Sequence, residues 1–261
     1  MTEKSAIREY RVLLNNVVDK DVQSMLLPLN LMQNITFNPK YRIKNNFIRP
    51  IGIIHNFVSL IGTGIFIYAL FHRLYILHVE KRDDDIFVQY VISLFDCGYY
   101  SIGLAMNFIS GVFNTKAYIS FVLIFQNIHR FLNDSKRSEH IKFWNWCSVI
   151  MAGSFFVVLF LGCGLQLGLP YYYVLSCCSL VSFDFNYIYA IRLLKLLEDK
   201  LILWNTLALN SQRMEDGGEV KRIFDAYVNI MEGYKIYKVC FRKIVSGHRK
   251  FNRTVIFVNY V

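Results

Sequence analysis

The sequence is short of charged residues. They make up 18% of its 261 residues, whereas soluble domains usually carry about a quarter. The shortage is concentrated in four apolar stretches, residues 51–71, 86–113, 143–169 and 171–191. A helix of about 20 mostly apolar residues is long enough to cross a bilayer. Backbone groups in lipid must also bond internally. The sequence therefore predicts an all-α, polytopic membrane bundle with four transmembrane helices.

Patterns that carry catalytic or metal chemistry are also missing. The six cysteines include no C-x-x-C pair, and no two of the six histidines stand four apart on a helix. The glycines of residues 162–168 lie within an apolar stretch, with no preceding strand to form a dinucleotide-binding loop. There is no serine nucleophile elbow. We expect no enzyme, no cofactor and no metal site.

The basic residues are distributed unevenly around the four stretches. Of 29 Lys and Arg residues, 26 lie before residue 51, within 114–142 or from Arg192 onward. Because cytoplasmic segments are rich in Lys and Arg, we expect both ends of the chain inside the cell. The expected location is the plasma membrane. The charge is then a topology signal, so no nucleic-acid partner is expected.

This distribution divides the chain into three parts. We predict a cytoplasmic N-terminal segment (1–50), a four-helix transmembrane region (51–191) and a cytoplasmic helical extension (192–261). Residues 117–128 are apolar but too short to cross alone, and are expected to form a cytoplasmic helix.

Within the extension, leucine periodicity continues the fourth span toward residue 209, and EDGG at 215–218 interrupts it. A second helix follows, whose predicted apolar face comprises Val220, Ile223, Phe224, Tyr227, Val228 and Met231. We expect the two helices to pack on each other or on a partner chain. A helix lying on the membrane surface is the alternative. Residues 254–261 resemble the start of a fifth span, so the chain is expected to be a fragment or a truncated product.

Two acids lie within the predicted spans. Asp96 and Asp184 each stand in an otherwise uncharged stretch. Because a charge near the bilayer centre is costly, such acids usually face the protein interior. One interpretation is that they mark a ligand site or, for Asp184, a structural or gating contact. The other is that each is protonated and hydrogen-bonded. The nearby partners would be Tyr99, Tyr100, Tyr187 and Tyr189.

Two segments resemble insect gustatory receptors, particularly those of moths and butterflies. They are SMLLPLNLMQNITFNPKYRIKNNFIRPIG, which leads into the first span, and SFDFNYIYAIRLLKLLEDKLILWN, which continues the fourth. The resemblance implies a seven-helix subunit of a tetrameric, ligand-gated cation channel with a cytoplasmic N-terminus. It also implies a small-molecule tastant, membrane lipid and other receptor subunits as partners. The family's pore-lining last helix and its signature are missing from this sequence.

By position alone, the resemblance places a ligand pocket in the outer halves of the spans. The candidate ligand-binding residues are Gln89, Asp96, Phe155, Gln166, Tyr172 and Tyr173. Two alternatives remain open: a fragment like a G-protein-coupled receptor, and a non-conducting membrane scaffold or truncation product. The class of ligand, whether sugar, bitter compound or other, stays undetermined.

Overall fold

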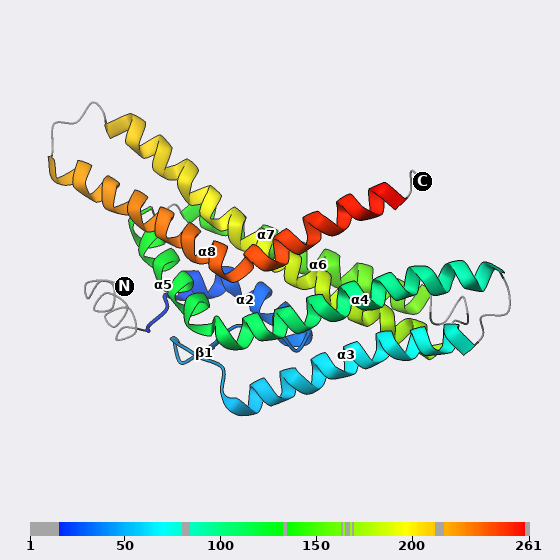
Figure 1. Ribbon diagram of the computed structural model, residues 1–261. Coiled ribbons are helices and arrows are strands. Elements are labelled where there is room, and N and C mark those ends of the chain that lie inside the picture. Colours follow the sequence, from blue (N-terminus) through cyan, green and yellow to red (C-terminus); the bar gives the residue numbers. More distant parts are fainter. Residues whose placement is uncertain are drawn as a thin grey trace.

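The computed structural model describes residues 16–79, 84–132, 135–162, 164, 168, 170–211 and 217–258. This part of the chain is mostly helical, which confirms the predicted all-α class (Figure 1). Its elements are α2 (Lys20–Ile35), β1 (Arg42–Lys44), β2 (Phe47–Arg49), α3 (Ile53–Val79), α4 (Asp84–Phe113), α5 (Thr115–Phe131), α6 (Ser135–Leu161), α7 (Tyr171–Ser211) and α8 (Gly217–Val258).

Three of these helices, α3, α6 and α7, are each long and apolar enough to cross a membrane. A fourth candidate arises only if α4 and α5 are counted together, and these two helices are bent by 68° relative to each other. The sequence predicted that residues 86–113 would be long and apolar enough to cross a membrane without α5. Polar residues spaced along α4, among them Ser93, Asp96 and Asn107, lower its mean hydropathy.

The helices also differ in length from the predicted spans. The first continues past residue 71 to Val79, and the third begins at Ser135 instead of residue 143. Hydrophobicity marks the part of a helix that lipid would cover, whereas hydrogen bonding continues the helix beyond it.

Helices α3, α4, α6 and the first half of α7 form a bundle on the right of Figure 1. Within it, α3 packs against α4 and α7, while α6 packs against α2 and α7. The α4–α7 contact is aromatic. The Phe183 ring lies 5.7 Å from the Tyr99 ring and 5.5 Å from the Tyr100 ring, both edge to face, a favoured geometry for aromatic pairs.

Gly103 makes this contact possible. A Cβ atom at Gly103 would lie 2.5 Å from the Phe183 ring. Gly98, on the same helix, has open space around it. The contrast gives a matched pair of substitutions.

We predict that Gly103→Ala lowers the free energy of unfolding by about 1–3 kcal/mol, because it overpacks the α4–α7 contact. Gly98→Ala should leave stability unchanged or slightly raise it, since alanine suits a helix interior better than glycine. Thermal unfolding in detergent measures both. Equal effects of the two substitutions would contradict the proposed role of Gly103.

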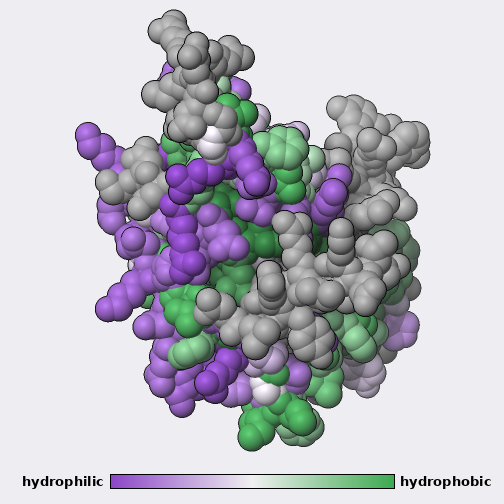
Figure 2. All heavy atoms as spheres, turned by 90° about the vertical axis from the view of Figure 1, so that its left-hand side faces the viewer, coloured by the Kyte–Doolittle hydropathy of each residue, from purple (hydrophilic) through white to green (hydrophobic). Residues whose placement is uncertain are grey.

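A second unit lies on the left of Figure 1, where α2, α5, the second half of α7 and the first part of α8 meet. Helix α5 packs against α8, and most of its side chains are buried. Helix α7 continues unbroken for 41 residues and packs against α8, as the leucine pattern predicted. Its Trp204 indole donates a hydrogen bond of 2.8 Å to the Ile223 carbonyl of α8. Figure 2 looks onto this end, where many hydrophilic side chains gather.

The packed face of α8 differs from the predicted one. Among the α8 residues whose burial the structure describes, the buried ones are Ile223, Ala226, Ile230, Gly233, Tyr237, Cys240 and Phe241. Val220, Phe224 and Met231 of the predicted face are exposed instead. The absence of a side chain at Gly233 allows close approach to α7, since a Cβ there would lie 3.3 Å from Leu197. Ala226 is a second small buried residue of α8. A pattern of large apolar residues misses such positions. Residues 254–258 continue α8 as helix, and 259–261 lie outside the described residues.

The chain before α2 is attached to α5. The Gln126 side chain accepts a hydrogen bond from the Asp19 backbone N–H at 2.8 Å and donates one to the Val17 carbonyl at 3.0 Å. The Arg130 guanidinium donates two hydrogen bonds, of 2.7 and 2.8 Å, to the Asp19 carboxylate. These contacts link the N-terminal segment to the interior of the second unit.

A hairpin joins α2 to α3. Strand β1 pairs antiparallel with β2, with Ile43 opposite Ile48. The turn residues Asn45 and Asn46 have φ angles of 54° and 66°. Asparagine tolerates this left-handed conformation, which two-residue hairpin turns require. The hairpin ends four residues before α3 begins, so it lies beside the start of the first candidate span.

Lys40 is buried where this segment meets the bundle and the second unit. Its ammonium donates hydrogen bonds of 2.8 Å to the Asn38 side-chain oxygen and 2.8 Å to the Asn107 side-chain oxygen of α4. It also lies 5.7 Å from the centre of the Tyr118 ring of α5. Burial lowers the pKa of Lys40 from its ordinary value of 10.5 to about 7, although the nearby Cys240 thiol acts in the opposite direction.

We predict that this lysine makes stability depend on pH. Because its folded-state pKa is depressed, the folded protein binds fewer protons than the unfolded protein between about pH 7 and 10.5, so stability rises with pH across that window. Lys40→Met should remove this rise in stability with pH. A single titrating group changes the free energy of unfolding by at most about 1.4 kcal/mol per pH unit. Thermal unfolding of both proteins as a function of pH measures it.

Lys116→Met, on an exposed position of α5, is the control and should follow the wild-type pH profile. Parallel wild-type and Lys40→Met profiles would show that Lys40 does not titrate in this window.

Candidate functional site

A cationic side chain lies between α3 and α7 near the far end of the bundle. Arg73 of α3 approaches the Ser176 hydroxyl of α7 at 3.5 Å. Its guanidinium carbon lies 4.9 Å from the centre of the Tyr173 ring, within the range of a cation–π interaction. The Nε atom of Arg73 is buried and has no hydrogen-bond partner among the described residues. Arg73 therefore retains an unused donor inside the bundle.

Several aromatic rings lie on the same stretches of α3 and α7 as Arg73 and Ser176. The Tyr172 and Tyr173 rings are 4.9 Å apart, and Tyr172 is buried. The His72 ring lies 6.0 Å from the Tyr172 ring and 5.6 Å from the Tyr68 ring. The α3–α7 contact thus combines a guanidinium over the Tyr173 ring with an edge-on His72–Tyr172 pair.

Helix α4 contributes an acid and a hydroxyl. Asp96 is half-buried and lies within electrostatic range of Arg73. Ser93, one turn earlier, is buried, and its hydroxyl has no hydrogen-bond partner in the described part of the chain. Arg73, Asp96, Tyr172, Tyr173 and Ser176 are called the Arg73 cluster below.

The structure brings three of the predicted ligand-binding residues into this cluster: Asp96, Tyr172 and Tyr173. Gln89 is exposed on α4, and Phe155 is 64% exposed on α6. Gln166 lies outside the described residues. The predicted set is therefore divided between the cluster and the surface of the isolated chain.

Sequence reasoning missed Arg73 and counted it as a loop charge. The predicted first span ended at residue 71, two residues before Arg73. The apolar residues Leu74, Ile76 and Leu77 continue beyond it, and this signal would have extended the helix past Arg73.

Asp184 occupies a different place. It is exposed on α7, within electrostatic range of Tyr99 and Tyr100 of α4. These are two of the four tyrosines that the sequence suggested as its neighbours. A structural or gating role for Asp184 stays a prediction.

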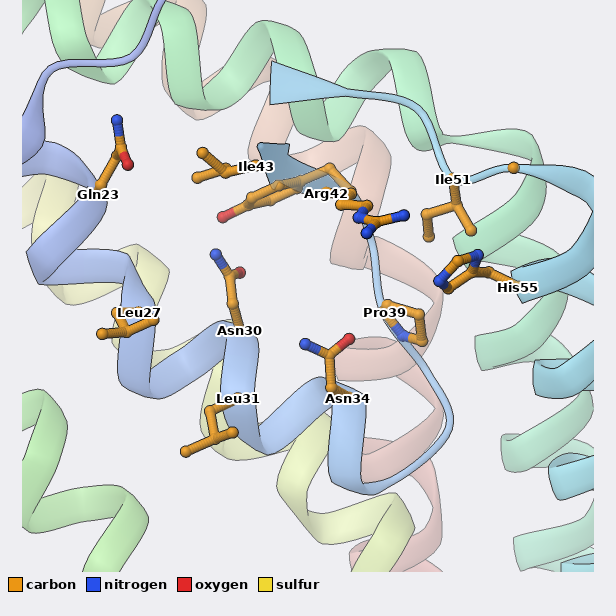
Figure 3. Close-up of a pocket in the computed structure, with 12 residues that line it drawn as sticks. Gln23, Leu27, Asn30, Leu31, Asn34, Pro39, Arg42, Ile43, Ile51 and His55 are labelled. Carbon is orange, nitrogen blue, oxygen red and sulfur yellow. The ribbon is translucent and has the colours of Figure 1, made fainter. Parts of the chain in front are cut away.

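A cavity of about 490 Å³ lies at the opposite end of α3, between α2, the hairpin and the first turn of α3 (Figure 3). None of the predicted ligand-binding residues lines it. The residues that do are Gln23, Leu27, Asn30, Leu31, Asn34, Pro39, Tyr41, Arg42, Ile43, Ile51, Gly52 and His55.

Comparisons with known proteins give no match to this chain, whether with family models, curated proteins or solved structures. The chemistry of the site must therefore be inferred from its own residues.

The side chains of the Arg73 cluster present hydrogen-bond donors and aromatic ring faces. A guanidinium recognises carbonyl, hydroxyl or carboxylate oxygens, and tyrosine rings stack on apolar or ring-shaped groups. Within the described residues, no group of three His, Cys, Asp or Glu side chains is placed to hold a metal ion.

We predict that Arg73 and Asp96 are energetically coupled. In a double-mutant cycle of Arg73→Met and Asp96→Asn, the two effects on the free energy of unfolding should deviate from additivity by about 0.5–3 kcal/mol, as for residues in one polar network. Unfolding in detergent measures the four proteins. The control cycle combines Arg73→Met with the distant Lys221→Gln, and the two effects on the free energy of unfolding should be additive. Additivity of the Arg73 and Asp96 effects would contradict the cluster.

Proposed function

We propose that this chain is a chemosensory receptor subunit of the insect gustatory type, which binds a small-molecule tastant at the Arg73 cluster. In this proposal it lies in the plasma membrane with α3, α4, α6 and α7 as spans and both ends in the cytoplasm. It assembles with other receptor subunits, as a homo- or hetero-tetramer, and the assembly conducts cations.

The observation that carries the proposal is the unbroken helix α7. It holds Tyr172, Tyr173 and Ser176 of the cluster at one end and Trp204, bonded to α8, at the other. At 1.5 Å per residue, the helix between Tyr173 and Trp204 is about 45 Å long. A shift of α7 on ligand binding would therefore reach the α5–α8 unit directly.

Each of the two segments that resemble gustatory receptors forms one continuous part of the structure. The first forms α2, the hairpin and the approach to α3, and the second lies within α7. The hairpin and the second unit contain many of the basic residues that favour the cytoplasm.

Co-expression with a full-length gustatory receptor tests this proposal. The chain should change the amplitude or half-maximal concentration of ligand-evoked currents. Arg73→Met should shift that concentration by about tenfold or more, because a charged hydrogen bond contributes about 1.5–3 kcal/mol. Phe155→Ala removes an exposed ring on α6 and should change it less than about twofold. Currents identical with and without the chain would instead indicate a non-conducting bystander.

The second candidate is a fragment like a G-protein-coupled receptor, which would place the N-terminus outside the cell. An N-terminal tag separates the two. We expect antibody to reach the tag only after the cells are permeabilised, because basic residues flank α3 on its N-terminal side. Labelling of intact cells would favour the second candidate.

A further inference from the structure

The cavity between α2, the hairpin and α3 has the chemistry of an anion site. Figure 3 shows Asn30 and Asn34 of α2 facing Arg42 of β1 and His55 of α3. These side chains supply amide, guanidinium and imidazole donors. Among the residues that the structure describes, no acidic side chain lines the cavity. A bound anion would therefore meet donors and a positive charge without a competing carboxylate.

The hairpin register adds an independent observation. Arg42 is directly opposite Arg49, and both are exposed. Like charges in directly opposed positions destabilise a strand pair. Lys44 shares this face, since it is two residues from Arg42. None of the ion pairs within the described chain involves these three residues. An anion near the two arginines would relieve their repulsion.

The surroundings indicate that the anion is attached to a lipid. The first turns of α3, which place His55 at the cavity, also present apolar side chains outward. Ile53 is 87% exposed and Ile54 is 78% exposed. Leu27 and Leu31, exposed on α2, line the cavity itself. A phosphate in the cavity would thus lie beside surfaces that suit acyl chains, at the end of a helix long enough to cross a membrane.

We propose that this cavity binds the phosphate of an anionic phospholipid headgroup, held by Arg42 and His55 with the amides of Asn30 and Asn34. Arg49, opposite Arg42 on the hairpin, adds positive charge beside the cavity. The acyl chains lie along the first turns of α3. The site is separate from the Arg73 cluster and does not depend on the proposed receptor function.

The test uses the full chain in nanodiscs of phosphatidylcholine with increasing fractions of phosphatidylglycerol. Phosphatidylglycerol should raise the thermal midpoint of the wild type, because a ligand that binds the folded state stabilises it. Inorganic phosphate, at matched concentration in phosphatidylcholine discs, should have little effect.

The variant Arg42→Gln/Arg49→Gln should need at least about tenfold more phosphatidylglycerol for the same shift, since each basic residue near an anionic surface contributes roughly a fivefold effect. The matched control Lys221→Gln/Arg222→Gln removes two exposed charges at the start of α8 and should stay within about twofold of wild type. In pure phosphatidylcholine, the hairpin variant should be at least as stable as wild type, because it removes a like-charge pair.

If the hairpin and α8 variants lost the response to phosphatidylglycerol equally, the proposed site would be overturned. Such a result would show that the anionic lipid attracts basic residues of the chain in general. A wild-type response to inorganic phosphate as large as that to phosphatidylglycerol would overturn the lipid assignment. If the double variant is unstable in phosphatidylcholine, Arg49→Gln alone provides the measurement. It leaves the residues that line the cavity intact and should weaken the response about fivefold, and an unchanged response would overturn the proposal.

Discussion

The buried Lys40 ammonium constrains the architecture at the point where its parts meet. A cation removed from water requires acceptors and is costly when they are missing. Asn38 of the connecting segment and Asn107 of α4 supply two amide oxygens, and the Tyr118 ring of α5 lies nearby. Moving any of these elements would leave the charge unsolvated. The lysine thus fixes how the N-terminal segment, the bundle and the second unit are arranged.

Packing around Lys40 depends equally on the absence of a side chain. A Cβ at Gly111 would lie 3.2 Å from the Asn38 side-chain oxygen and 3.7 Å from the Lys40 nitrogen. The glycine leaves room for this polar contact beside α4. Gly103 does the same for Phe183 further along that helix. Small residues on one face of α4 therefore determine what packs against it.

Lys40 and Arg73 both point inward, and the hydrogen bonds and ring contacts described for them are to uncharged groups. Lys40 is solvated by amide oxygens at one end, while Arg73 contacts a serine and a tyrosine ring at the other. Helix α7 connects the region of Arg73 to the α5–α8 unit. This arrangement places the Arg73 cluster at one end of a single continuous helix and the packed contact with α8 at the other.

The sequence by itself determined the helical class, the apolar stretches, the short helix near 117–128 and the continuation of α7, because hydrophobicity and periodicity are local properties. It also placed Asp96, Tyr172 and Tyr173 among the ligand candidates. Only the tertiary structure decided that Arg73 joins them, that α4 bends into α5, that α8 packs through Ala226 and Gly233, and that Lys40 is buried. Each of these features depends on contacts between residues far apart in the chain, and no single stretch encodes which neighbour will cover it.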